Sequence, residues 1–296
     1  MAHGDRKASV NGIPARVRAR DGGLIPADRI GGRMLITLLR QTLWRTPLRV
    51  RRRLLRIAPV RALHDAFYRR FGVHIVPERR LGFSMQIDVS QFDFRAHFRT
   101  PHVERHVIDF LVHHVPRDAR AIDIGSFCGY YALLFGVRAG PAGRVVAFEP
   151  LEEHRSWIER NTRLNALTNV VVDPRAVGAH TGSAVVRVRG PATSLVGGGR
   201  GYDQSIEVIR LDDFVAGGGI DRVDVVKIDA EEAEIEVLEG MRQVLRDNRP
   251  ILVIEVNHDE GRRRVEEFFR SVDYEAELLG RAAHGMHLAG CPRSPD

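Results

Sequence analysis

The segment AIDIGSFCGYYALLF, residues 121–135, decides the fold. Its first residues are apolar apart from Asp123, which is typical of a short buried strand, and a helix is predicted over 129–138. Gly125 and Gly129 frame the turn between them, where glycine allows a tight bend and a close approach of the backbone to a ligand. The order acid-x-Gly-x-x-x-Gly therefore predicts a ligand-binding turn. It differs from the Gly-x-Gly-x-x-Gly order of dinucleotide-binding proteins.

The alternation of strand and helix continues beyond this segment. Apolar strands are predicted at 121–125, 144–150, 169–173, 222–229 and 250–257, with helices at 129–138, 152–165, 231–247 and 259–270. Two more strands are predicted at 177–190 and 205–211, and a hairpin at 272–290. This pattern predicts an α/β fold with a mostly parallel sheet covered by helices on both faces.

We place this α/β domain at 119–290. The preceding chain divides into a basic tail at 1–32, with little apolar periodicity, and a cap at 33–118. Short helices are predicted at 33–71 and extended chain at 73–90, with a turn near Arg80 and Gly82. A helix near 101–114 is expected to begin after Thr100 and Pro101, which suit its first positions.

Three acids end successive predicted strands: Asp123, Glu149 and Asp173. The carboxyl ends of parallel strands meet at the edge where open α/β sheets bind ligands. An acid ahead of the first glycine would repel a pyrophosphate, but it suits a cationic or zwitterionic ligand such as the amino acid end of S-adenosylmethionine. Glu149 is placed to accept hydrogen bonds from two ribose hydroxyls, and Asp173 lies where an adenine edge is expected.

From about residue 119 to residue 280, the chain resembles S-adenosylmethionine-dependent methyltransferases of the FkbM type. The matching segments are AIDIGSFCGYYALLF, GRVVAFEPLEEHRSWIERNTRLN, RLDDF, VDVVKIDAEEAEIEVLEGM and ILVIEVN. The resemblance implies a Rossmann-like class I methyltransferase with a seven-stranded sheet, and transfer of a methyl group to oxygen. It also implies that Asp123, Gly125 and Glu149 contact the cofactor, and we add Phe127 and Gly129 from the same turn.

One position departs from the family pattern. The family commonly has Asp-x-Glu-Gly-x-Glu, whereas this chain has Asp229-Ala230-Glu231-Glu232-Ala233-Glu234. We expect strain at Glu232 if its φ is positive, because side chains other than glycine disfavour that conformation. As an acid in the first turn of a helix, Glu232 could equally be harmless, and we expect activity to be intact.

The acceptor chemistry is expected after the strands at 222–229 and 250–257. Asp229, Glu231 and Glu255 are candidates for orienting a hydroxyl and removing its proton, with Asn257 and His258 as candidate acceptor contacts. The three carboxylates could instead hold a divalent metal, which we do not favour because acids at strand ends are common without one. Lys227, inside a strand, is expected to pair with an acid such as Asp123 or Glu149.

The net charge of +7 is unevenly distributed. Residues 1–80 contain 19 basic and 5 acidic residues, and the rest of the chain is net acidic. This leaves open a nucleic-acid methyltransferase, or a non-catalytic module that docks on an anionic membrane or partner. No Asn/Asp-Pro-Pro-aromatic motif and no Pro-Cys or Thr-Cys nucleophile supports nucleic-acid methylation, so we favour a small-molecule hydroxyl acceptor.

Two features bear on location. Only two cysteines are present, and no apolar run of about 18 residues suggests a membrane span. We therefore expect a cytoplasmic protein. The sequence leaves its oligomeric state and the identity of its acceptor open.

Overall fold

The structure is a computed structural model that describes residues 57, 59, 73–88, 104–188, 202–281 and 285–293. The chain divides into two compact units, Met1–Ala58 and Pro59–Asp296, and all described residues except Ile57 belong to the second. The predicted tail at 1–32, most of the helices predicted at 33–71, and the helix-start residues Thr100 and Pro101 lie outside the described residues.

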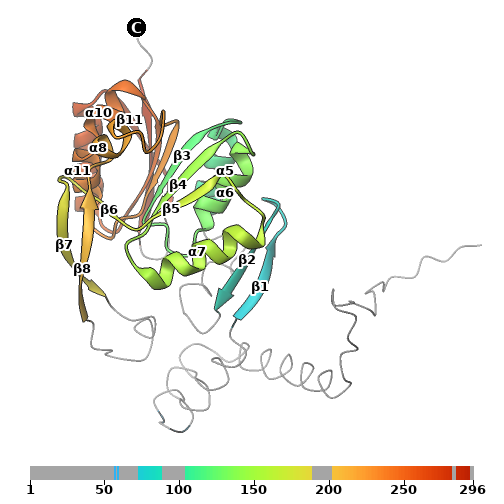
Figure 1. Ribbon diagram of the computed structural model, residues 1–296. Coiled ribbons are helices and arrows are strands. Elements are labelled where there is room, and N and C mark those ends of the chain that lie inside the picture. The colour runs from blue at the N-terminus through green and yellow to red at the C-terminus, as the bar shows by residue number, and fades with distance from the viewer. Residues whose placement is uncertain are drawn as a thin grey trace, which may run out of the picture. The chain divides into compact units, whose positions relative to one another are not determined.

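A seven-stranded sheet forms the centre of the second unit, with the order β11-β12-β10-β9-β3-β4-β5 (Figure 1). Five neighbouring strands are parallel: β10 (Ile251–Val256), β9 (Val225–Ile228), β3 (Arg120–Ile124), β4 (Arg144–Phe148) and β5 (Val170–Asp173). β12 (Met286–Pro292) runs antiparallel to both β10 and β11 (Tyr274–Arg281). The predicted mostly parallel sheet of seven strands is confirmed.

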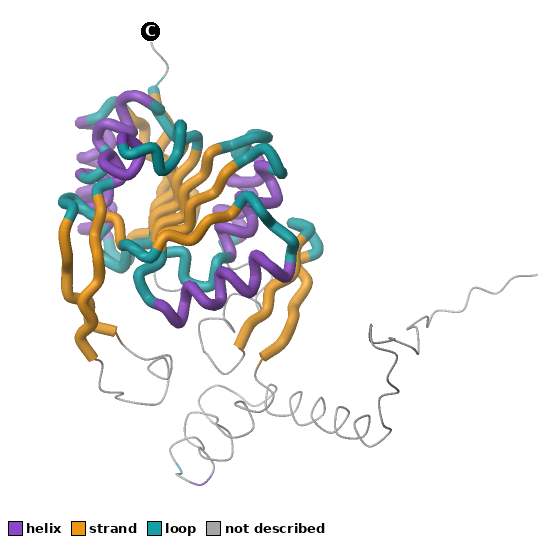
Figure 2. Tube along the Cα trace, in the orientation of Figure 1, coloured by secondary structure: helices purple, strands orange, loops and turns teal. Residues whose placement is uncertain are grey.

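Helices cover both faces of this sheet (Figure 2). Side chains alternate along each strand, so Ala121 and Val225 enter one hydrophobic core while Ile122 and Val226 enter the other. The first core packs under α5 (Arg105–His114), α6 (Tyr130–Ala139) and α7 (Glu152–Leu164). The second packs under α8 (Leu211–Ala216), α9 (Glu234–Glu239), α10 (Arg242–Asp247) and α11 (Asp259–Ser271).

A hairpin of β1 (Val73–Glu78) and β2 (Phe83–Asp88) adds to the first core. Phe83, Met85 and Ile87 are buried there. The β2 backbone is also tied to α7 and the residue that follows it, since Gln86 N donates to Asn161 Oδ1 (2.6 Å) and Ser84 N to Asn165 Oδ1 (2.7 Å). This part of the predicted cap therefore packs as an integral part of the α/β unit.

A second, three-stranded sheet has the order β6-β8-β7, formed by β6 (Ala176–Val177), β8 (Tyr202–Ile209) and β7 (Gly182–Val188). β7 and β8 pair antiparallel and form the long arm at the left of Figure 1. The glycine-rich loop predicted at 197–201 lies outside the described residues.

Two predicted helix boundaries are wrong. The predicted helix at 231–247 is two helices, α9 and α10, separated at Gly240, where a Cβ would lie 2.0 Å from the carbonyl oxygen of Gly178. α5 begins at Arg105, after Glu104 with φ 54°, rather than directly after Pro101. Among the described helices, none is long and apolar enough to cross a membrane.

Candidate functional site

The turn between β3 and α6 lies at the carboxyl edge of the sheet. Gly125, Phe127 and Gly129 have φ values of 74°, 50° and 86°, so the chain takes the left-handed conformation three times in five residues. Gly125 N donates to Phe148 O at the end of β4 (3.0 Å), and a Cβ on Gly125 would lie 1.8 Å from Asp229 O. The turn is therefore wedged between the ends of β4 and β9, which only glycine permits at this position.

Glu149 faces this turn from the end of β4. Its carboxylate is buried and accepts hydrogen bonds from Phe127 N and Leu151 N, both at 2.9 Å. The ring of His154 on α7 lies 3.3 Å from the same carboxylate and packs edge-on against Phe127, with centroids 4.6 Å apart. The structure thus brings together Glu149 and Phe127, as expected, and adds His154. Its place five residues after Glu149, in the first turn of α7, is the sequence signal that could have indicated it.

Asp123 lies beneath the turn and keeps only 2% of its surface exposed. Its Oδ2 accepts a hydrogen bond from Ser126 Oγ (2.6 Å). Burial raises the pKa of Asp123 to about 6, although the Ser126 hydrogen bond and the charge of Lys227 oppose the rise. A buried carboxylate in this state is a favourable neighbour for a positively charged ligand group, because the added cation would stabilise its ionised form.

Asp173 ends β5, but its carboxylate is already engaged. Arg175 binds both of its oxygens, with Nε 2.9 Å from Oδ1 and Nη2 2.6 Å from Oδ2. Glu149 N also donates to Asp173 O (3.0 Å), so the two acids lie at neighbouring strand ends. The role of Asp173 at an adenine stays a prediction, and the sequence analysis missed Arg175 as its partner.

Lys227 is the most buried charge of the site, with no exposed surface. Its Nζ lies 3.9 Å from Asp229 Oδ2 and 3.9 Å from Glu255 Oε2, and it donates to Ile228 O (3.3 Å). The expected pairing of Lys227 with an acid is confirmed, but its partners are Asp229 and Glu255 rather than Asp123 or Glu149. β9 lies between β3 and β10, and the lysine side chain extends along the strand to its carboxyl end, where Asp229 and Glu255 are closer.

Asp229 and Glu255 share this lysine but differ in surroundings. The Asp229 side chain is 41% exposed and the Glu255 side chain 18%. Although part of the Asp229 side chain reaches solvent, the protein packed around its carboxylate and the neighbouring Glu255 raise its pKa against the effect of Lys227. Burial alone would raise the pKa of Glu255, but a hydrogen bond from His287 and the charge of Lys227 hold it below its usual value. The pair therefore holds Glu255 as the anion and gives Asp229 the greater affinity for a proton.

The remaining predicted residues lie around this pair. Glu231 and Glu232 are exposed, with φ values of 48° and 81°, so Glu232 has the positive φ at which we expected strain. His258 precedes α11, and its Nδ1 accepts a hydrogen bond from Gly261 N (2.8 Å). Asn257 is exposed beside it. The acceptor contacts proposed for Asn257 and His258 stay predictions.

One group of side chains has the composition of a metal site. Glu104, Glu255 and His287 place three possible ligand atoms within 4.8 Å of one another. The His287 ring nitrogens lie 3.2 Å from Glu255 Oε2 and 3.1 Å from His106 Nε2, and Tyr131 OH donates to Glu104. Because these groups already bind one another and Lys227 lies beside Glu255, we assign no metal ion to them.

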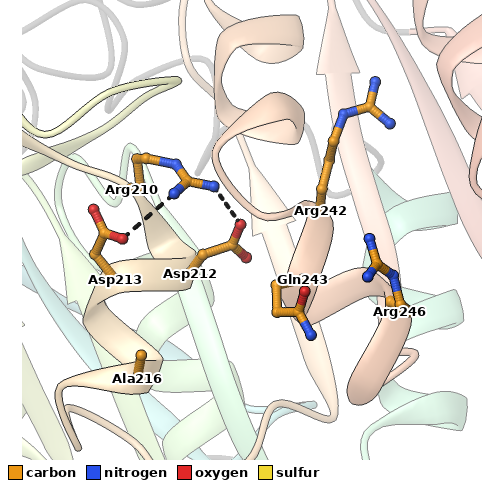
Figure 3. Close-up of a pocket in the computed structure, with 7 residues that line it drawn as sticks. All are labelled: Arg210, Asp212, Asp213, Ala216, Arg242, Gln243 and Arg246. Carbon is orange, nitrogen blue, oxygen red and sulfur yellow. Dashed lines mark hydrogen bonds and ion pairs between the residues drawn. The ribbon is translucent and has the colours of Figure 1, made fainter.

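A shallow hollow lies elsewhere on the molecule, between α8 and α10 (Figure 3). Arg210, directly before α8, pairs with Asp212 (2.7 Å) and Asp213 (3.4 Å) in the first turn of that helix. None of the strand-end acids lines this hollow, so it is separate from the site described above.

A family model described as "Methyltransferase FkbM domain" matches residues 119–278, more than half of the chain. A curated protein-L-isoaspartate O-methyltransferase from Caenorhabditis elegans is 30% identical over 70 residues, which cover 24% of this chain and 31% of that protein.

Solved structures with related folds include the methyltransferase FkbM from Methylobacillus flagellatus KT. It shows 22% identity and a TM-score of 0.44, and covers 59% of this chain and 44% of that chain. Fibrillarin from Aeropyrum pernix, solved with natively bound S-adenosyl-L-methionine, is 13% identical with a TM-score of 0.41. The match covers 60% of this chain and 68% of the fibrillarin chain. The chain thus spans less than half of the curated relative and of the FkbM structure.

Proposed function

Because the chain belongs to the methyltransferase FkbM family, we propose that it is an S-adenosylmethionine-dependent O-methyltransferase acting on a hydroxyl of a small molecule. The observation that carries this proposal is the pair of buried acids, Asp123 and Glu149, on either side of the glycine turn at the carboxyl edge of the sheet. Polyketides, sugars and other secondary metabolites are the acceptor classes that we propose.

The chemistry of these residues fits the cofactor. S-adenosylmethionine supplies a methyl group on a positively charged sulfur, and carries an amino group and a ribose. Asp123 would hold the cationic end, since its burial makes a nearby positive charge favourable. Glu149, fixed by the backbone of Phe127 and Leu151, would accept hydrogen bonds from the ribose hydroxyls.

Asp229 and Glu255 would act on the acceptor. Asp229 is the more exposed of the two and has the greater proton affinity, so in its ionised form it is the stronger base for a hydroxyl proton. Glu255 stays ionised beside Lys227 and can orient the hydroxyl by accepting from it. Removal of such a base typically slows a reaction by about 100- to 10,000-fold.

A screen of hydroxyl compounds with methyl-labelled cofactor tests the proposal. We expect transfer by the wild type, a loss of about 100-fold or more with Asp229→Asn, and a smaller loss with Glu231→Gln. Glu260→Gln is the matched control, because Glu260 is a surface acid paired with Arg263 on α11. RNA is tested beside the hydroxyl compounds. The proposal would be contradicted if the wild type labelled RNA but none of the hydroxyl compounds, or if Asp229→Asn kept full activity.

For the basic N-terminal region we propose a peripheral contact with an anionic membrane. The excess of basic residues in 1–80 supports it. Flotation of the full chain with vesicles of anionic or neutral lipids, at low and high salt, tests this. Binding that is the same for both lipids would contradict it.

A further inference from the structure

Two histidines lie behind the Asp229–Glu255 pair. His287 is fully buried on β12 and stands opposite Glu255 in the antiparallel register of β10 and β12. Its Nε2 lies 3.2 Å from Glu255 Oε2, and its Nδ1 lies 3.1 Å from Nε2 of His106 on α5. His106 is partly exposed, and its ring is held by β11, since a Cβ on Gly280 would lie 2.8 Å from it.

The carboxylate fixes the direction of these hydrogen bonds. A neutral imidazole has one donor and one acceptor nitrogen. With Glu255 ionised and able only to accept, a neutral His287 carries its proton on Nε2 and donates it to Glu255 Oε2. Nδ1 of His287 is then the acceptor, and Nε2 of His106 donates to it. The hydrogen bonds therefore run in series from His106 through His287 to Glu255.

The hydrogen-bonded series from His106 to Glu255 makes the two carboxylates differ in their affinity for a proton. Both lie 3.9 Å from Lys227 Nζ, but Glu255 also receives the His287 hydrogen bond. The other charged or titratable groups that face the pair or its lysine are Glu104 before α5, Tyr131 on α6, Asp123 on β3 and Glu231 after β9. Two carboxylates that share one cation resist simultaneous ionisation, so a donor to one of them directs the proton to the other.

We propose that His287, held in place by His106, is a positioning residue that keeps Glu255 ionised and so makes Asp229 the group that exchanges a proton at this site. This inference rests on the proposed function. Asp229 binds a proton in the free protein and gives it up to solvent when a cationic methyl donor binds, so the base is available when the acceptor arrives. Loss of the His287 donor makes Glu255 compete for that proton, and the pair then keeps it to higher pH.

The proton that Asp229 gives up can be measured directly as proton release on cofactor binding, and this measurement requires no acceptor. S-adenosylmethionine is titrated calorimetrically into the full-length protein, in buffers of different ionisation enthalpy, over a range of pH. We expect the wild type to release up to one proton, and to release less with the uncharged thioether S-adenosylhomocysteine. We expect His287→Leu to raise the pH midpoint of release by roughly one unit, the equivalent of a lost hydrogen bond to a charged group.

Two further variants separate this role from a structural one. His287→Gln keeps a side-chain N–H donor and should restore the wild-type midpoint. His106→Leu, at a partly exposed position, should move the midpoint in the same direction as His287→Leu by a smaller amount. It replaces His287→Leu as the test variant if that protein does not fold. An unchanged midpoint in the leucine variants, or a wild-type midpoint that moves on treatment with EDTA, would overturn the inference.

The cofactor titration also separates the two proposals. If S-adenosylmethionine binds without pH-dependent proton release, the inference fails while the proposed function stands. If S-adenosylmethionine does not bind at all, both fail.

Discussion

Replacement of Glu232 by glycine should stabilise the protein. Glu232 has φ 81°, a conformation that glycine adopts freely and other residues do not. Its side chain is exposed, and the hydrogen bond from its backbone N to Glu234 Oε1 (2.9 Å) does not depend on the side chain. The substitution therefore removes the Cβ from a strained position and keeps the local hydrogen bond.

The size of the effect follows from two opposing costs. A side chain in the left-handed region costs about 1–2 kcal/mol. Glycine adds conformational freedom to the unfolded chain, which costs about 0.4–1 kcal/mol. The net gain in the free energy of unfolding should be about 1 kcal/mol, equivalent to a rise in Tm of about 2–4 °C in a protein of this size.

Urea denaturation and thermal melting measure this gain. Glu232→Gln is the matched control, because it removes the charge but keeps the Cβ, and it should leave stability within about 0.5 kcal/mol of the wild type. An equal gain in both variants would show that charge among Glu231, Glu232 and Glu234 is responsible. A loss of stability in Glu232→Gly would refute the argument from backbone strain.

Three further substitutions, the first with a control at Gly218, test the site. Gly125→Ala would place a Cβ 1.8 Å from Asp229 O at φ 74°, so thermal melting should show a loss of about 3 kcal/mol. Gly218→Ala has φ 79° but open space around the Cβ and should lose only about 1–2 kcal/mol, whereas equal losses would contradict the packing argument. For Asp123, a raised pKa of about 6 means that ionisation destabilises the folded state as pH rises from the unfolded pKa through 6. Asp123→Asn should therefore gain up to about 3 kcal/mol relative to the wild type between pH 4 and 7 in urea denaturation, and a constant difference would argue against the shift. Lys227→Met removes the cation shared by two acids and should lose about 3 kcal/mol at neutral pH. The loss should be smaller at pH 4, because acids that no longer face the lysine take up protons more readily; a pH-independent loss would contradict the ion pairing.

The fold could be predicted because its signals are local. Strands such as RVVAF (144–148) are buried on both faces after their first residue, so they stand out as continuous apolar runs. Strain at Glu232 could be predicted only on the condition of a positive φ, because the sequence does not set that angle. The break between α9 and α10 could not, because it depends on the approach of Gly240 to Gly178 from a distant part of the chain.

The acids of the site could be predicted from the sequence, but the residues that hold them could not. Strand ends placed Asp123, Glu149, Asp229 and Glu255 at one edge of the sheet. His287 and His106 carry no local signal, since they reach Glu255 from an antiparallel strand and a helix whose register only the folded sheet sets. The partners of Lys227 depend in the same way on strand order, which is why the expected partners were wrong.

Calorimetric titration of S-adenosylmethionine into the wild type and Glu149→Ala tests the central claim most directly. We predict that the wild type binds and that Glu149→Ala binds about 10- to 100-fold more weakly, the effect of losing hydrogen bonds to a charged group. Glu152→Ala, at an exposed position in the first turn of α7, should bind as the wild type does. Equal affinity of wild type and Glu149→Ala, or no binding by the wild type, would contradict a cofactor site at these strand ends.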